Sequence, residues 1–190
     1  MKMTGFEKLY VNSGVNSWRV ARHAAGLLRH VKPERGQTYL DLGCGNGEAP
    51  ILIAVAYGLR VTGVDVDPAQ IAAARSAAEG LGHAEFVTGD GTHLPFDGDS
   101  FDIVASYKTT HHMSRWLEAL EELVRVLRPG GYFIYNDLTW PSGLVPLVRR
   151  WARKSGFPTV PALEAFLQRH ELTVLHRRRS PFHFEVVCLS

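Results

Sequence analysis

Three glycines at alternate positions follow a short apolar segment in the first third of the chain. The segment Tyr39–Leu42 leads into Gly43, Gly45 and Gly47, and an apolar, helix-like segment begins directly after them. Because glycine has no Cβ and reaches backbone angles that other residues avoid, such a turn lets a ligand lie directly against the main chain at a helix start. The pattern predicts a loop that binds a nucleotide-type cofactor.

Acidic residues end the next two predicted strands. Asp65 closes the segment Arg60–Asp65, and Asp90 follows the segment Ala84–Gly89. A carboxylate in the position of Asp65, 22 residues after Gly43, can accept hydrogen bonds from both hydroxyls of a ribose. We therefore expect two carboxylates at the carboxyl ends of two adjacent strands.

The residue after the glycines separates two classes of cofactor. A dinucleotide-binding loop has the pattern Gly-x-Gly-x-x-Gly, whereas Glu48 stands where the last glycine is needed. A bulky, negatively charged side chain opposes a pyrophosphate group, so the sequence disfavours an NAD-dependent oxidoreductase.

With these residues the sequence resembles the class I S-adenosylmethionine (SAM) dependent methyltransferases, and within them the group similar to quinone-biosynthesis and other small-molecule methyltransferases. The resemblance covers Thr38 to Asn136 with ordered motifs and the remainder more loosely. Its motifs are Asp41–Gly47, Gly63–Asp65, Gly89–Asp90 with Leu94–Phe96, Phe101–Val104 followed by His111–His112, and Leu127–Gly131.

The resemblance implies an α/β fold with a three-layer, Rossmann-like, seven-stranded, mostly parallel sheet whose last strand is antiparallel. The alternation of strands and helices itself predicts a parallel sheet covered on both faces. The predicted strands Leu172–His176 and Phe182–Leu189 are joined by five residues, Arg177–Pro181. Because this connection is too short for a parallel crossover, we expect a hairpin with Arg177–Arg179 in its turn.

We expect a single domain over residues 1–190. Residues 37–137 would form the cofactor-binding core, residues 1–36 an N-terminal helical cap or lid, and residues 138–190 a helical insert and the C-terminal hairpin. The amphipathic helix predicted over Asn16–Val31 would either cover the site or simply pack on the sheet.

Capping residues and apolar spacing predict further helices. Asp67 is expected to cap a helix that has Pro68 in its first turn, and Ser114 to cap the helix after the fourth strand. A short helix is predicted over Pro161–Gln168.

The resemblance also implies which residues bind SAM and its product S-adenosylhomocysteine. Asp41 would hold the ammonium group, Asp65 the ribose hydroxyls and Asp90 the adenine amino group. Each carboxylate has a structural alternative, as a loop-ordering, solvent-exposed or turn residue respectively. The predicted cofactor-binding residues are Asp41, Gly43, Cys44, Gly45, Gly47, Asp65, Val66, Asp90, Gly91, Thr92 and Ser106, and no metal is expected.

Methyl transfer from a sulfonium disperses positive charge, so the main task of the protein is to align the acceptor and exclude water. A general base is needed only where the acceptor loses a proton, and histidine suits that role. His111 and His112 are the candidate catalytic residues, although in the resembled family such a pair also packs or orders the loop. Tyr107, His111 and Trp140 are expected to contact the acceptor.

Composition indicates which partners and which cellular compartment to expect. A net charge of +2 is too small to predict a nucleic-acid partner. Cys44 and Cys188 lack CxxC spacing, which fits a reducing compartment without structural zinc. Neither a signal-peptide core nor an apolar run long enough for a bilayer is present, so we expect a cytoplasmic protein. The basic, amphipathic segment Leu144–Lys154 leaves peripheral membrane contact as a less favoured alternative.

The sequence thus predicts transfer of a methyl group from SAM to an oxygen, nitrogen or carbon of an unspecified small molecule. A non-catalytic SAM-binding regulator is the alternative from another class. Methylation of nucleic acid is disfavoured, because residues 106–109 read Ser-Tyr-Lys-Thr instead of the Asn/Asp-Pro-Pro-Tyr type of motif. The oligomeric state is not predicted.

Overall fold

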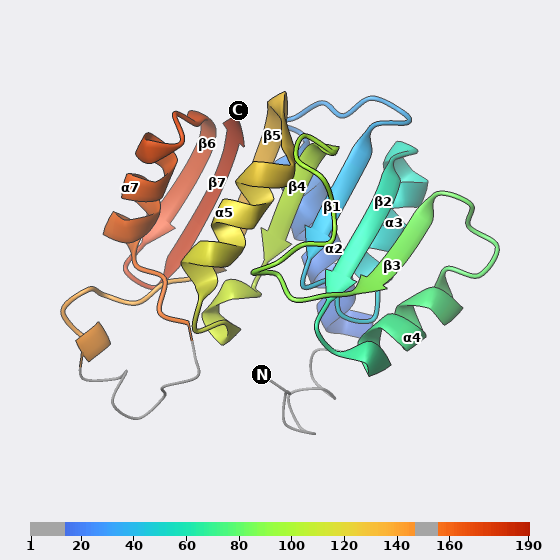
Figure 1. Cartoon of the computed structure of the whole chain (residues 1–190), viewed down its shortest axis with the longest axis horizontal. Coiled ribbons are helices and arrows are strands. Elements are labelled where there is room, and N and C mark those ends of the chain that lie inside the picture. Colours follow the sequence, from blue (N-terminus) through green and yellow to red (C-terminus); the bar gives the residue numbers. More distant parts are fainter. Residues whose placement is uncertain (1–13, 147–155) are drawn as a thin grey trace.

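A seven-stranded sheet forms the centre of the computed structural model, which describes residues 14–146 and 156–190 (Figure 1). Its strand order is β3-β2-β1-β4-β5-β7-β6. The strands are β1 (Thr38–Leu42), β2 (Arg60–Asp65), β3 (Ala84–Thr88), β4 (Phe101–Tyr107), β5 (Leu127–Leu138), β6 (Thr173–Ser180) and β7 (His183–Leu189). The helices of the described ranges are α2 (Gly14–Leu28), α3 (Glu48–Tyr57), α4 (Pro68–Ala77), the 3-10 helix η1 (Thr110–His112), α5 (Trp116–Val126) and α7 (Val160–Arg169).

Strand β7 is the antiparallel member of the sheet. It runs antiparallel to both of its neighbours, β5 and β6, whereas the pairs β1·β2, β1·β4, β2·β3 and β4·β5 are parallel. The predicted Rossmann-like, mostly parallel sheet with an antiparallel last strand is confirmed. The carboxyl ends of the parallel strands therefore share one edge, at the bottom of Figure 1.

The prediction that Arg177–Arg179 form the hairpin turn is wrong. These residues lie inside β6, and the turn falls between Ser180 and His183. Arg177 and Arg179 point to the same face, two residues apart, and their guanidinium groups both bond to Glu164 of α7. Because β6 is an edge strand, its charged residues can be accommodated without burial.

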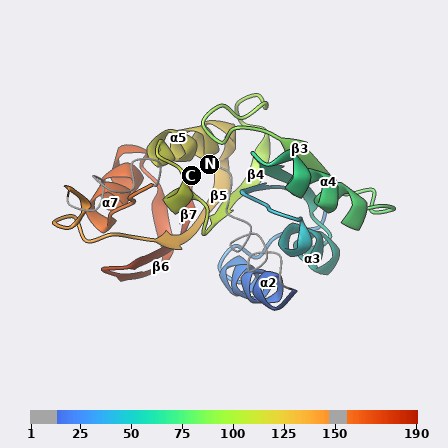
Figure 2. The same ribbon diagram turned by 90° about the horizontal axis from the view of Figure 1, so that it is seen from below.

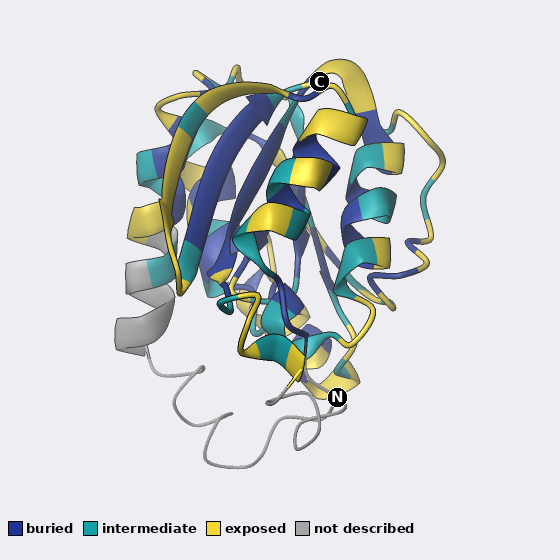
Figure 3. Cartoon of the chain, turned by 90° about the vertical axis from the view of Figure 1, so that its left-hand side faces the viewer, coloured by how far each residue is buried: buried dark blue, intermediate teal, exposed yellow. Residues whose placement is uncertain are grey.

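Helices cover both faces of the sheet (Figure 2). Ala24, Leu27 and Leu28 of α2 pack with α3 against one face. Leu120 of α5 and Phe166 of α7 pack against the other face. Figure 3 shows the result, with central strands that are buried and helices that are buried only on their inner sides. The described part of the N-terminal helix is thus a packed layer of the fold, and residues before Gly14, which belong to the predicted cap or lid, lie outside the described ranges.

A polar network around the buried carboxylate of Glu185 also joins α2 to the sheet. The carboxylate of Glu185 on β7 bonds to the ring of His23 and accepts hydrogen bonds from His176 (3.0 Å) and from Asn136 (3.0 Å). Burial alone would raise the pKa of Glu185, but the bonds from the two histidines hold that pKa below its usual value. The ring of His30, just after α2, stacks on that of His176, so both the helix and the turn that follows it contact the C-terminal hairpin.

Two capping predictions have different outcomes. Asp67 is the N-cap of α4 and accepts a hydrogen bond from the Ala69 amide at 3.0 Å, as predicted. The cap predicted at Ser114 is wrong, because α5 begins at Trp116 with Arg115 in the N-cap position. Arg115 uses its guanidinium to pair with Glu118 in the first turn.

No helix among the described residues combines the length and the apolar character needed to cross a membrane. Within the same ranges, no three His, Cys, Asp or Glu side chains gather as a set that could hold a metal ion. Most of the predicted amphipathic segment Leu144–Lys154 lies outside the described residues.

Candidate active site

The loop between β1 and α3 is held open by its glycines. Gly43, Gly45 and Gly47 all have positive φ values, of 80°, 54° and 80°, which other residues rarely adopt. The amides of Gly43 and Cys44 both donate to the carbonyl of Val64 on β2, at 2.7 and 3.1 Å. The loop is therefore fixed to the neighbouring strand at the point where α3 begins.

Two of the glycines serve close packing and one faces open space. A Cβ on Gly43 would lie 2.1 Å from the hydroxyl oxygen of Thr109, and one on Gly47 would lie 2.7 Å from the Cβ of Ala74. At Gly45 the nearest atom to such a Cβ would be the side-chain oxygen of Gln70, at 4.0 Å. Gly45 is thus the loop position at which another molecule can approach the backbone.

Asp65 links this loop to the next helix. One oxygen of its carboxylate accepts a hydrogen bond from the Gly45 amide at 3.0 Å, and the other accepts one from the Asp67 amide at 2.9 Å. The side chain is partly exposed at the end of β2. It therefore lies beside the open position of the glycine loop, at the strand end where the sequence places it, and its contact with a ribose stays a prediction.

Asp41 is a buried carboxylate beneath the same loop. It is 4% exposed, and none of the other described residues donates a hydrogen bond to it. Burial, with a smaller contribution from the charge of Asp65, raises the pKa of Asp41 to about 7. A cation placed beside Asp41 would favour its ionised form.

Gln70 is a site residue that sequence reasoning missed. It is 3% exposed, and its side-chain oxygen has no hydrogen-bond partner among the described residues. This oxygen faces the Gly45 part of the loop. A buried amide oxygen without a partner is unfavourable, so Gln70 is a candidate to bind a ligand at this loop. The signal in the sequence was a polar residue beside Ile71 in the first turn of α4.

The segment after β3 supplies the third predicted carboxylate. Asp90 accepts hydrogen bonds from the amide and the hydroxyl of Thr92, both at 2.9 Å, and the backbone hydrogen bond is the main reason why the pKa of Asp90 lies below its usual value. A Cβ on Gly91 would lie 2.8 Å from Leu42. Asp90 orders its own turn, and its contact with adenine stays a prediction.

The remaining predicted cofactor residues differ in accessibility. Val66 is 57% exposed beside Asp65. Cys44 is buried, and burial strongly raises the pKa of its thiol, so it is not a reactive group. Ser106 is fully buried on β4, with a hydroxyl that bonds to no other described residue. Cofactor contact stays a prediction for all three.

The segment after β4 lies across the edge of the sheet. The Thr109 hydroxyl donates to the carbonyl of Leu42 at 3.2 Å, and Met113 lies against Gly91, with its Cε 3.1 Å from where a Cβ of that glycine would be. The segment thus contacts the glycine loop at one end and the turn after β3 at the other. His111 and His112 lie between these contacts.

His111 is bonded to a second residue that sequence reasoning missed. Its Nδ1 lies 2.5 Å from Oδ1 of Asp137 near the end of β5. Asp137 is completely buried and also accepts hydrogen bonds from the amide (2.7 Å) and hydroxyl (2.6 Å) of Thr110 and from the amide of Leu138 (2.7 Å). An acid at a strand end, as at Asp65, was the available signal.

The three predicted acceptor contacts do not all come together. The Gly156 amide donates to the His111 carbonyl at 2.9 Å, and the neighbouring Phe157 packs edge-on against Trp140 with ring centroids 5.5 Å apart. His111 and Trp140 are therefore joined through one segment. Tyr107 instead packs in the core beneath α2, where its hydroxyl bonds to that of Tyr39 at 3.1 Å.

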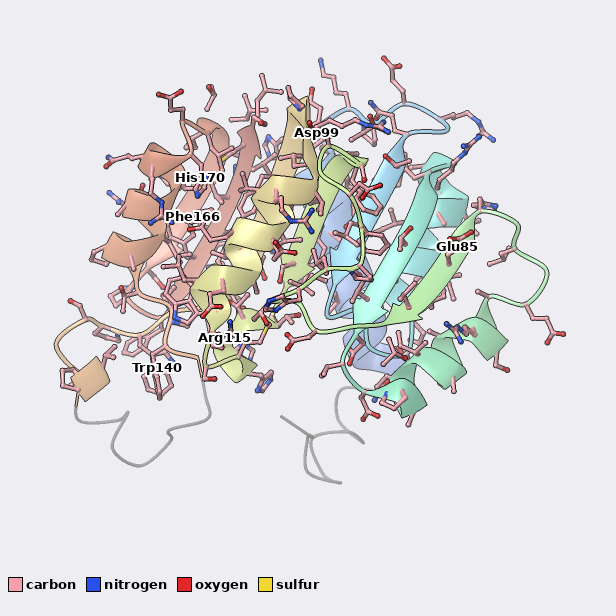
Figure 4. All side chains as sticks on the ribbon, viewed as in Figure 1. Glu85, Asp99, Arg115, Trp140, Phe166 and His170 are labelled. Carbon is pink, nitrogen blue, oxygen red and sulfur yellow. The ribbon has the colours of Figure 1, made fainter. Side chains whose placement is uncertain are left out.

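Figure 4 shows Trp140 near the carboxyl ends of the parallel strands, with Asp99 at the opposite edge. A separate hollow of about 370 Å³ lies between α4 and β3, and its lining residues, Arg75, Ala78 and Ala84 to Val87, include none of the predicted site residues.

The chain is similar to known proteins in both sequence and fold. The chain is 38% identical over 133 residues to demethylmenaquinone methyltransferase of Clavibacter sepedonicus, which covers 70% of this chain and 51% of that protein. It is 39% identical over 104 residues to phthiotriol/phenolphthiotriol dimycocerosates methyltransferase of Mycobacterium leprae, covering 54% of this chain and 38% of that protein. The chain thus spans about half the length of the first relative and less of the second.

The fold is similar to that of geranyl diphosphate methyltransferase in complex with SAM, with a TM-score of 0.76, 17% identity, and coverage of 94% of this chain and 91% of that one. At sequence level, residues 40–135 match the family described as "Methyltransferase domain". Because this match includes the glycine loop, both strand-end acids and the histidine segment, and extends over half of the chain, the protein belongs to the methyltransferase domain family.

Proposed function

We propose that this protein transfers a methyl group from SAM to a small molecule. The observation that carries the proposal is the hydrogen bond from the Gly45 amide to Asp65, because it brings a carboxylate that could accept from ribose hydroxyls beside a loop open at its backbone. When bound, SAM supplies a methyl carbon made electrophilic by the neighbouring sulfonium.

The residues around the loop fit such a ligand. Asp65 is suited to the ribose hydroxyls. The carboxylate of Asp41, which is buried and accepts no hydrogen bond from the other described residues, suits the ammonium group. The side-chain oxygen of Gln70, which has no partner among the described residues, could accept one further hydrogen bond from the ligand. These three side chains are hydrogen-bond acceptors, which matches a cofactor that carries positive charge and no phosphate.

The relatives support a small-molecule acceptor. The demethylmenaquinone and the phthiotriol/phenolphthiotriol dimycocerosates methyltransferases are named for small or lipid-like acceptors, and geranyl diphosphate methyltransferase for an isoprenoid. His111 and His112 lie at the edge where an acceptor would enter and are proposed to contact it. Both cysteines are free and buried, which supports the cytoplasmic location expected from the sequence.

Calorimetric titration with SAM, S-adenosylhomocysteine and NAD tests the cofactor. We expect SAM and S-adenosylhomocysteine to bind and NAD not to bind, because Glu48 opposes a pyrophosphate. Asp65→Ala should remove SAM binding, whereas the matched variant Asp99→Asn, at the opposite edge of the sheet, should retain it. Binding of NAD, or indifference to SAM at millimolar concentration, would overturn the proposal.

Transfer of a radiolabelled methyl group to a panel of small molecules separates an enzyme from the alternative, a non-catalytic SAM-binding regulator. We expect transfer to at least one member of the panel. A protein that binds SAM tightly and methylates none of a broad panel of oxygen, nitrogen and carbon nucleophiles would favour the regulator.

A further inference from the structure

We propose that His111 is the general base of the reaction, that Asp137 is its positioning residue, and that the acceptor is a small molecule with a phenolic or enolic hydroxyl. The inference rests on the proposed function, because it needs a methyl donor at the neighbouring loop.

The bond between the two residues assigns the proton positions on the imidazole ring. Among the described residues, every other group that hydrogen-bonds to the Asp137 carboxylate is a donor, namely the amide and hydroxyl of Thr110 and the amides of His111 and Leu138. Nδ1 of His111 therefore donates as well, and Nε2 of the neutral ring is left as an acceptor. The structure thus gives His111 the tautomer that a general base requires.

The burial of the two side chains suits this division of roles. Asp137 is fully buried, whereas the His111 side chain is 17% exposed. Asp137 is thus shielded from solvent and acts only through His111, which it orients. A buried carboxylate beside Nδ1 also stabilises the imidazolium that forms when Nε2 takes a proton.

The position of His111 relative to the cofactor loop is fixed at two points. Thr109 packs against Gly43, and Met113 packs against Gly91. The short η1 helix between them carries His111, and the His112 ring packs against the His111 ring with centroids 3.9 Å apart. His111 is therefore held at the rim between the methionine side and the adenine side of the proposed cofactor site.

The surroundings of His111 favour a planar acceptor. The segment that binds the His111 carbonyl continues into Phe157, which packs on Trp140. Phe157 is buried in this contact and Trp140 is half-buried, so the Trp140 ring is the aromatic surface left for a flat, conjugated molecule. A base would also be superfluous for a carboxylate, which has no proton to lose. A phenol or enol is acidic enough to pass its proton to imidazole during attack.

The step balances without another reactant. The acceptor oxygen forms a bond to the methyl carbon as the carbon–sulfur bond breaks, and the electron pair of that bond stays on sulfur. The hydroxyl proton passes to Nε2 of His111 and is later lost to water.

Comparing two acceptors tests the role of His111. At mildly alkaline pH 1-naphthol is mostly protonated, whereas 4-nitrophenol is already ionised. His111→Gln should lower kcat for 1-naphthol by about 100-fold or more and affect 4-nitrophenol far less, with the dissociation constant for SAM unchanged. Equal losses for both phenols would indicate a structural role and overturn the proposal, as would retained turnover of 1-naphthol. His83→Gln, before β3 at the other edge, is the matched control.

A comparison of phenols with other acceptors tests the proposed acceptor class. Cyclohexanol, benzoate and a thiol complete the panel, and we expect transfer to the phenols in preference to these three. If the protein binds SAM but methylates only the thiol or the carboxylate, or none of the hydroxyl compounds, the assigned class is wrong. Failure to bind SAM would instead overturn the proposed function.

Nitrogen-15 NMR of the histidine rings tests the pair without any acceptor. In the wild-type protein His111 should show a protonated Nδ1 and an unprotonated Nε2. Asp137→Asn should alter this tautomer and lower kcat about 100-fold, while Asp99→Asn should change neither. A protonated Nε2 in the neutral wild-type ring, or a tautomer that Asp137→Asn leaves unaltered, would contradict the assignment. If Asp137→Asn does not fold, the tautomer of wild-type His111 and the kinetics of His111→Gln still test the proposal.

Discussion

Thr109 occupies the space that a side chain on Gly43 would need. Their segments are far apart in the sequence, yet a Cβ at position 43 would lie 2.1 Å from the Thr109 hydroxyl oxygen. The glycine loop and the histidine segment are therefore packed as one unit. This contact makes Gly43 necessary for two reasons, its positive φ and the absence of a side chain.

Gly43→Ala should therefore destabilise the protein more than the same substitution at a glycine that has a positive φ but space for a Cβ. Gly36 has a similar φ of 86°, and a Cβ at that position would meet no atom within 4 Å, so Gly36→Ala should cost about 1 kcal/mol. Gly43→Ala should cost about 1–3 kcal/mol more because of the clash. Urea denaturation measures both. Equal losses for the two variants would show that Thr109 moves aside freely.

The stability of the protein should fall as pH rises from about 4 to about 7, through Asp41. Because its pKa is raised to about 7 whereas that of an unfolded aspartate is about 4, the folded state retains a proton that the unfolded state has lost. As the pH rises from about 4 to about 7, Asp41 lowers the free energy of unfolding by up to about 1.4 kcal/mol per pH unit. Above about pH 7 it causes no further change. Denaturation of Asp41→Asn across the same pH range should lack this component, and identical slopes for the two proteins would refute it.

SAM affinity should show the opposite dependence on pH. A bound ammonium group favours the ionised Asp41 carboxylate, so binding below about pH 7 releases a proton, and the affinity rises with pH until about 7. Calorimetry at one pH in buffers of different ionisation enthalpy counts the released protons. Asp41→Asn should release fewer, and a wild-type protein that releases none at pH 6 would place the ammonium group elsewhere.

Gln70→Met should stabilise the protein and weaken cofactor binding. The substitution keeps the volume of the side chain but removes a buried amide oxygen without a described partner, which should raise the free energy of unfolding by about 1 kcal/mol. Loss of one hydrogen bond to the ligand should lower SAM affinity about 10-fold. Thermal melts with and without SAM measure both effects. Gln168→Met, on the exposed side of α7, is the control, and unchanged SAM affinity in Gln70→Met would remove Gln70 from the site.

Asp65→Asn and Asp67→Ala should separate binding from stability. An asparagine at position 65 can accept with only one oxygen, so the bonds from the Gly45 and Asp67 amides cannot both survive, and SAM affinity should fall at least about 10-fold. Asp67→Ala removes the cap bond to Ala69 and should cost about 1 kcal/mol of stability with SAM affinity retained. Loss of affinity in Asp67→Ala alone would reverse the two roles.

Local signals predicted most of the fold. Alternating apolar segments gave the strands, and the short connection after His176 gave the antiparallel β7, because loop length limits the direction of the next strand. The Asp67–Pro68 pair also marked a helix start correctly. The error at Arg177–Arg179 came where a residue of another element contributed to the outcome, since Glu164 of α7 pairs with Arg177 and Arg179 inside β6. At Ser114 the N-cap is instead Arg115, which pairs locally with Glu118.

The sequence by itself determined the glycine loop and the acid at the end of β2, because both depend on backbone angles and on a strand end that local sequence specifies. Only the tertiary structure decided that Asp137 lies against His111, 26 residues away, that Gln70 faces the loop, and that Tyr107 points into the core beneath α2. These relationships depend on which strands become neighbours and on which face of the sheet each side chain lies. The pairing of β4 with β5 and the packing of the helices decide which strands are neighbours and which face each side chain occupies. Spacing along the chain reveals neither the strand neighbours nor the faces.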